Sequence, residues 1–190
     1  MVRGSANPKH LRLPLRLKKA RKQSGLTRMA LAQLSEVSTP TALYVETGQQ
    51  IPTVGTIARL ASALAMSAAW LAYGIGEQVI EGPPIDCSGM GARLRTARAE
   101  QGHTKASLAR LAELNPGSIA GIENGGQAGV DTVERLAKEL RVSPAWLAFG
   151  VGDRELLRRR SRLAISPTTE NNSRDTLTGK STEKGEPSRA

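Results

Sequence analysis

Aromatic side chains are scarce in this sequence, which has one Phe, two Tyr and two Trp among 190 residues. We therefore expect small hydrophobic cores built from Leu, Ala, Val and Ile. Cys87 is the only cysteine, so no internal disulfide can form, and two separate histidines provide no cluster of metal ligands. The sequence also lacks the run of about 18 apolar residues that a membrane-spanning helix requires. It thus predicts neither a disulfide scaffold nor a metal site.

Catalytic patterns are missing as well. We find no paired carboxylates and no cysteine with a histidine partner, so we expect no enzyme activity and no cofactor. The first twenty residues are basic but lack the apolar segment of a secretory signal, which favours a cytoplasmic protein with no membrane partner. A transit peptide is the alternative, because Met1 to Lys22 contain no acidic residue.

The dominant feature is an internal repeat. Residues 70–77 read WLAYGIGE and residues 146–153 read WLAFGVGD, an offset of 76 positions. Further towards the N-terminus the matching offset becomes 77, as in Arg21 with Arg98 and Glu46 with Glu123. So long a period with only two copies indicates two duplicated small domains rather than a solenoid.

Apolar residues at helical spacing, together with capping residues, predict five helices in each copy and an all-α fold. We place the first domain at 13–76 and the second at 90–153, joined by a short linker with Pro and Gly at 77–89. A flexible basic arm is expected at 1–12, a basic helical extension at 154–165 and a disordered tail at 166–190.

Several positions specify where helices begin. Thr27, Ser38 and Asn115 are suited to capping helix N-termini, and a proline follows closely after the last two. Asp131, with a glutamate three residues later, resembles a capping box. Leu34 is expected on the buried stripe of the second helix.

The net charge of +10 is unevenly distributed. Residues 1–76 contain 10 basic and 2 acidic residues (+8), residues 77–153 contain 8 and 10 (−2), and residues 154–190 contain 9 and 5 (+4). A basic domain attracts nucleic acid through its phosphates, whereas an acidic domain opposes that attraction. Solvated surface charge is the plainer interpretation of the same residues.

Two short helices joined by a tight turn, the second followed by Glu-x-Gly, resemble the helix-turn-helix of the phage Cro-and-repressor (XRE) family. The matching residues occur twice in the same order. In the first copy they are Gly25-Leu26-Thr27, Leu31-Ala32, Val37-Ser38, Glu46-Thr47-Gly48, Leu60 to Leu64 and Trp70 to Gly74; in the second, Gly102-His103-Thr104, Leu108-Ala109, Glu123-Asn124-Gly125, Leu136 to Leu140 and Trp146 to Gly150.

The resemblance implies binding of double-stranded DNA, with helices 39–46 and 116–123 as recognition helices in the major groove. It implies phosphate or base contacts at Arg28 and Lys105. Ion pairs within the fold are implied between Arg21 and Glu46 and between Arg98 and Glu123.

The base-facing positions differ between the copies. In the first copy the resemblance places Thr39, Pro40, Thr41 and Tyr44 there, and in the second Pro116, Gly117, Ser118 and Gly121. The second set lacks any long hydrogen-bond donor, so we expect it to read little sequence. Further basic residues are expected to attract phosphates: Arg16, Lys18, Lys19 and Lys22, with Arg3, Lys9 and Arg12 in the arm.

Two functions follow as hypotheses. The first is a phage-repressor-like transcriptional regulator at the nucleoid of a bacterial or phage system, binding mainly through its first copy, either as a homodimer or as an intramolecular pseudo-dimer. The second is an anti-activator or adaptor that uses the scaffold, the second copy above all, to bind a regulatory protein. Fold alone does not separate them.

Overall fold

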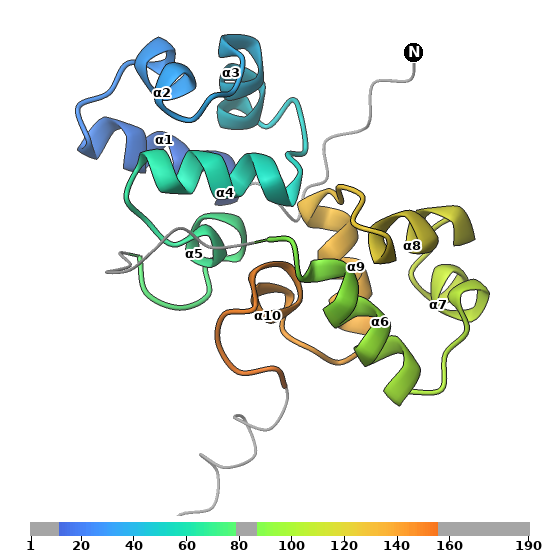
Figure 1. Ribbon diagram of the computed structural model, residues 1–190. Coiled ribbons are helices and arrows are strands. Elements are labelled where there is room, and N and C mark those ends of the chain that lie inside the picture. The colour runs from blue at the N-terminus through green and yellow to red at the C-terminus, as the bar shows by residue number, and fades with distance from the viewer. Residues whose placement is uncertain (1–11, 79–86, 156–190) are drawn as a thin grey trace, which may run out of the picture. The chain divides into compact units, whose positions relative to one another are not determined.

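The computed structural model describes residues 12–78 and 87–155 (Figure 1). The arm up to residue 11, most of the linker, and the extension and tail from residue 156 lie outside the described residues. Within that part the chain is all-α, as predicted, with five helices in each copy. They are α1 (Arg12–Gln23), α2 (Arg28–Leu34), α3 (Thr39–Thr47), α4 (Val54–Ala63), α5 (Ala68–Tyr73), α6 (Met90–Glu100), α7 (Lys105–Leu111), α8 (Pro116–Glu123), α9 (Val130–Glu139) and α10 (Pro144–Phe149). None of these helices is long and apolar enough to cross a membrane.

Side-chain caps set the helix starts. The Thr27 hydroxyl accepts a hydrogen bond from the backbone N–H of Ala30 at 3.1 Å. At α3 the Ser38 hydroxyl accepts the backbone N–H of Thr41 at 3.2 Å. The Asn115 side-chain oxygen accepts the N–H of Gly117 at 2.7 Å. Each cap satisfies an N–H that has no partner inside its helix. The three predicted caps are therefore confirmed.

Two local predictions are wrong. The N-cap of α9 is Gly129 rather than Asp131, and the Asp131 carboxylate instead lies 3.5 Å from Arg135 one turn along the helix. Leu34, expected in the core, is 61% exposed, because the buried side of α2 is formed by Leu31 and Ala32. A seven-residue helix has room for few buried positions, and here neighbouring residues occupy them.

The core of each copy is built from equivalent aliphatic residues. Leu17, Leu31 and Val45 from α1 to α3 are almost fully buried, and so are Leu94, Leu108 and Ile122 at the matching positions of the second copy. Within each copy the second and third helices contact each other, and the third also contacts the first. In Figure 1 the labels α2 and α3 stand beside each other above α1. The scaffold is thus the same in both copies.

The chain returns along each copy after its last helix. The N–H of Ser67 donates to the carbonyl of Gln78 at 2.9 Å, and the N–H of Ser143 donates to the carbonyl of Arg154 at 2.8 Å. The Arg154 guanidinium lies 4.9 Å from the centre of the Trp146 ring, within cation–π range. Arg154, where the basic helical extension was expected to begin, therefore lies in a returning segment and not in a helix.

The two copies contact each other through a short antiparallel pairing of residues 52–54 with residues 128–130, which we call the seam. Thr53 pairs with Gly129, flanked by hydrogen bonds from Val54 N–H to the Ala128 carbonyl at 2.9 Å and from Val130 N–H to the Pro52 carbonyl at 3.1 Å. Helices α5 and α10 also touch across the seam.

Glycines on two helices of the second copy give opposite predictions. A Cβ on Gly91 of α6 would lie 2.5 Å from the carbonyl oxygen of Ile122, so Gly91→Ala should lower the free energy of unfolding by about 1–3 kcal/mol. A Cβ on Gly121 of α8 would meet nothing within 4 Å, so Gly121→Ala should raise it by about 0.8–1 kcal/mol. Urea unfolding followed by circular dichroism measures both changes. Effects of the same sign would contradict this packing.

Candidate nucleic-acid interface

Helices α2 and α3 of the first copy form the helix-turn-helix unit. Between them lie Ser35, a left-handed residue at Glu36 (φ 53°), and Val37 and Ser38. The same turn recurs before α8, where Glu113 has φ 54°. Ser38 starts α3 and Gly48, in the left-handed region, ends it. The backbone needed to present a recognition helix is therefore built in both copies.

One side of α3 faces solvent and carries side chains of useful length. Thr39 and Pro40 are exposed, Tyr44 is 43% exposed and Leu43 is 36% exposed. Thr41 is half-buried, and its hydroxyl lies 2.8 Å from the hydroxyl of the capping Ser38. Among the described residues the hydroxyls of Thr39 and Tyr44 have no intramolecular hydrogen bond. These two hydroxyls are therefore the ones available to an external partner.

Part of this exposed side of α3 was not expected from the sequence. Pro40, Leu43, Tyr44 and Thr47 follow one another at i, i+3, i+4 and i+7, the spacing of one helix face. Leu43 and Thr47 are exposed and complete that face. The helical period would have included them had it been applied to the exposed side of α3 as well as to its core side.

The corresponding side of α8 is nearly bare. Pro116, Gly117, Ser118 and Gly121 are all exposed. Of these, Ser118 alone carries a side-chain hydrogen-bonding group, and Gly121 stands where α3 has Tyr44. To an external partner, helix α8 therefore offers backbone groups, the hydroxyl of Ser118 and little else.

A buried glutamate holds each recognition helix in place. The Glu46 side chain is 1% exposed and receives Arg21 through both carboxylate oxygens, at 2.7 and 3.1 Å. Arg28, at the start of α2, adds a third contact at 2.9 Å. In the second copy Arg98 holds Glu123 in the same way, at 2.6 and 3.2 Å. Both ion pairs expected from the resemblance are thus present.

Burial and hydrogen bonding act in opposite directions on Glu46. Desolvation by burial raises the pKa of its carboxyl, whereas hydrogen bonds from Arg21 and Arg28 and their positive charges lower it, and the net shift is downward. Arg28 remains 43% exposed while its Nε is held by the carboxylate. Its outer nitrogens are therefore positioned at the surface beside α3, a geometry suited to a phosphate oxygen.

Arg16 has a different role from the one expected. Its guanidinium donates to the carbonyls of Leu71 and Ala72 at 2.9 and 2.7 Å, at the C-terminal end of α5. Arg93 donates to Leu147 and Ala148 in the same way in the second copy. A cation at a helix C-terminus satisfies carbonyls that have no partner within the helix. We therefore exclude Arg16 from the candidate interface.

Three lysines of the first copy lie apart from the α2–α3 unit. Lys18, Lys19 and Lys22 are exposed on the side of α1 opposite its buried stripe. At the matching positions the second copy has Arg95, Thr96 and Ala99. These lysines therefore contribute general positive charge, which the second copy largely lacks.

Lys105 takes the place of Arg28 in the second copy. Its Nζ lies 3.8 Å from the Glu123 carboxylate and its side chain is 46% exposed. Arg95 approaches the same carboxylate at 3.7 Å. The second copy therefore keeps a cation at the start of the unit, although its recognition face is bare.

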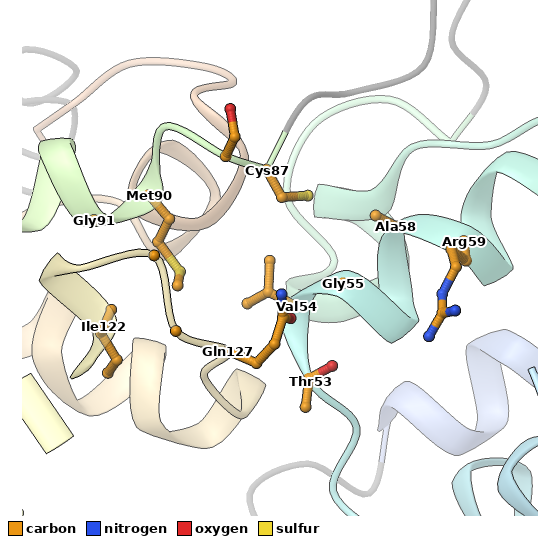
Figure 2. Close-up of a pocket in the computed structure, with 13 residues that line it drawn as sticks. Thr53, Val54, Gly55, Ala58, Arg59, Cys87, Met90, Gly91, Ile122 and Gln127 are labelled. Atoms are coloured by element: carbon orange, nitrogen blue, oxygen red, sulfur yellow. The ribbon is translucent and has the colours of Figure 1, made fainter.

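A cavity of about 690 Å³ borders the seam (Figure 2). Figure 2 shows Val54 and Ala58 of the first copy on one side and Met90 and Gln127 of the second copy on the other, with Cys87 between them. The cavity is therefore lined by residues of both copies.

Comparison with known protein families assigns both halves of the chain to one structural class. A family model described as a helix-turn-helix domain matches residues 12–72, and a second model, described as helix-turn-helix, matches residues 94–147. The chain carries two helix-turn-helix domains in tandem, which match the XRE type. It is a DNA-binding regulator of that kind. Searches of curated proteins and of solved structures found no match.

The buried ion pair predicts a pH-dependent difference in stability between the wild type and a variant that lacks the Glu46 carboxylate. Because the folded-state pKa of Glu46 lies below its ordinary value of 4.5, the pair stabilises the fold above that pH and loses this effect as the pH falls through the folded-state pKa. Glu46→Gln should lower the unfolding free energy by about 3 kcal/mol at neutral pH. Urea unfolding over a pH series should show the difference from wild type shrinking below pH 4.5.

The control is Glu77→Gln, a change at an exposed glutamate after α5, which should alter stability little at any pH. If the unfolding free energy of Glu46→Gln stayed below that of the wild type by the same amount down to the lowest pH, the ion-pair explanation would be contradicted.

Proposed function

We propose that this protein is a transcriptional regulator of the phage-repressor type whose first copy performs most of the DNA recognition. The contrast between α3 and α8 carries the proposal: at equivalent positions α3 exposes Tyr44, whereas α8 has Gly121. Reading bases in the major groove requires side chains that reach the base edges. The charge of +8 over residues 1–76, against −2 over residues 77–153, supports the same asymmetry.

In the proposed complex α3 lies in the major groove and α2 crosses the phosphate backbone. Thr39 and Tyr44 present hydroxyls to base edges, and Thr41 contributes its methyl group. Arg28, held by Glu46, contacts a phosphate. Lys18, Lys19 and Lys22 increase the rate of encounter with DNA through long-range attraction.

The second copy has a smaller part in this complex. Lys105 and Ser118 contact the DNA backbone and carry no sequence information, since phosphate contacts position a protein without specifying bases. We place the protein in the cytoplasm, where it acts on DNA as a regulator without enzyme activity.

A second function, binding of a regulatory protein, is favoured by one observation. A hollow of about 260 Å³ lies beside α8, lined by residues that include Leu114, Ser118, Gly121 and Thr132. It opens where Tyr44 stands in the first copy. A hollow with an apolar wall, at the place where the reading side chains are lost, could take a side chain from a protein partner.

The first function predicts unequal effects of matched substitutions. Tyr44→Ala should weaken binding to a duplex selected from a random library by about five-fold or more, equivalent to about 1 kcal/mol or more for a lost base contact. Ser118→Ala in the second copy should change the affinity by less than about two-fold. Fluorescence anisotropy with the full chain measures both affinities, and unfolding curves confirm that each variant is folded. Equal losses from the two variants would refute the dominance of the first copy.

The second function is tested by filling the hollow. Gly121→Tyr should leave DNA affinity within about two-fold of wild type, because α8 reads no bases. If the hollow binds a protein, a protein retained from cell extract by the wild-type chain should be lost with Gly121→Tyr and kept with Tyr44→Ala. Identical sets retained by all three chains would count against this function.

A further inference from the structure

The seam joins residues that are equivalent in the repeat. Adding the repeat offset of 76 to Thr53 gives Gly129, its partner in the pairing. The hydrogen bond from Val54 to Ala128 is matched by the one from Val130 to Pro52, and the same offset converts each into the other. An interface in which a residue meets its own equivalent, with reciprocal bonds on either side, is the mark of two-fold symmetry.

A second contact across the seam obeys the same rule. The rings of Tyr73 and Phe149, also 76 positions apart, have centroids separated by 6.3 Å at an interplanar angle of 51°. A tilted arrangement of two rings is favourable and stabilises the interface beyond the effect of the apolar area that the rings bury. The Tyr73 hydroxyl also lies 3.3 Å from the Val130 carbonyl, and burial raises the pKa of that hydroxyl, so it stays protonated and donates.

Burial shows that the seam is part of the core. Val54, Val130 and Ala128 are between 0% and 3% exposed, and Phe149 is 4% exposed. The buried side chains of both copies form one continuous hydrophobic cluster. Separating the copies would expose these residues and leave two backbone N–H groups without their protein partners. The copies therefore form a fused pair rather than two domains that move independently.

A pseudo-two-fold axis through the seam relates α3 to α8. Duplex DNA has its own two-fold axes, and proteins that match them place two recognition helices in half-sites about 34–36 Å apart. One chain with this internal symmetry has two helix-turn-helix units related by a pseudo-two-fold axis. The symmetry extends to the scaffold but not to the reading faces, because α3 carries Tyr44 and α8 carries Gly121.

We propose that a single chain occupies both half-sites of a DNA operator as an internal dimer, and that the operator is asymmetric. The half-site under α3 is read by sequence. At the half-site under α8, Lys105 and the N-terminal end of α8 contact the phosphate backbone of the DNA. This inference rests on the proposed DNA-binding function and adds to it the stoichiometry and the form of the target.

The first test uses the full chain and duplexes selected from a random library. Sedimentation analysis should find one chain per duplex, and hydroxyl-radical footprinting should show protection of two adjacent half-sites. Single base-pair substitutions should reduce the affinity by about five-fold or more in one half-site, as expected for lost base contacts, and by less than about two-fold in the other.

The second test locks the seam. Thr53 and Gly129 form a non-hydrogen-bonded antiparallel pair, in which Cα atoms are about 4.5 Å apart, close enough for a disulfide. A Cβ on residue 129 would displace only the side chain of Asp131. The variant is Thr53→Cys with Gly129→Cys and Cys87→Ser, and its reduced form is the matched control. Oxidised and reduced forms should bind the selected duplex with affinities within about two-fold of each other.

Several outcomes would overturn the proposal. Two chains on a palindromic site, protection of one half-site only, or equal sensitivity to substitution in both half-sites would each do so. A loss of about ten-fold or more on oxidation, restored by reductant, would show that the seam opens on DNA. If the chain bound no duplex at all, the proposed function itself would fail. Duplex binding with the wrong stoichiometry would refute only the internal dimer.

Discussion

The buried carboxylate at the end of each recognition helix is the interaction on which the reading surface depends. Glu46 accepts hydrogen bonds from Nε and Nη2 of Arg21, and these bonds connect the end of α3 to α1. A third Arg21 nitrogen donates to the Leu26 carbonyl at 2.7 Å, which also ties in the turn before α2. One ion pair thus sets the positions of three helices. Replacing one partner of such a pair is costly because it leaves a buried charge without its counter-ion.

The second copy has the same arrangement but lacks long side chains on the exposed side of its third helix. Arg98, Glu123 and the bond from Arg98 to the His103 carbonyl reproduce the contacts of the first copy closely. The exposed side of α8, by contrast, has glycine where α3 has tyrosine. Buried positions are constrained by packing and by charge pairing, whereas exposed positions are constrained only by what they bind. In the proposed function, the second copy is therefore a scaffold that reads no bases.

The seam offers a reason to retain such a copy. A domain that contributes no base contacts in the proposed complex still buries apolar surface, pairs its backbone with residues 52–54 and keeps Lys105 beside Glu123 at the start of α7. In the proposed internal dimer, the two copies are covalently connected and share a buried interface, so two separate chains do not have to associate. The loss of translational freedom that such association costs is therefore avoided. The first copy can then read its half-site from a fixed position.

Much of this protein followed from its sequence alone. The repeat, the all-α class, the five helices of each copy and the caps at Thr27, Ser38 and Asn115 depend on local chemistry, namely helical period and the hydrogen-bonding capacity of short polar side chains. The loss of long side chains from α8 was also readable, since it concerns which residues are present and not where they lie.

Contacts between residues far apart in the chain were decided by the tertiary structure. Arg16 resembled a phosphate-binding residue by charge, but the fold brings α5 beside it, and the free carbonyls there accept its guanidinium. Leu34 fits an apolar pattern yet remains exposed, because α2 is too short to bury every apolar residue. The pairing of Thr53 with Gly129 has no local signal, because backbone hydrogen bonds between segments depend on position and not on side-chain identity. The sequence by itself determined the two scaffolds and the difference between their reading faces; the tertiary structure decided that they are joined about a pseudo-two-fold axis, since that depends on which surfaces meet once both copies have folded.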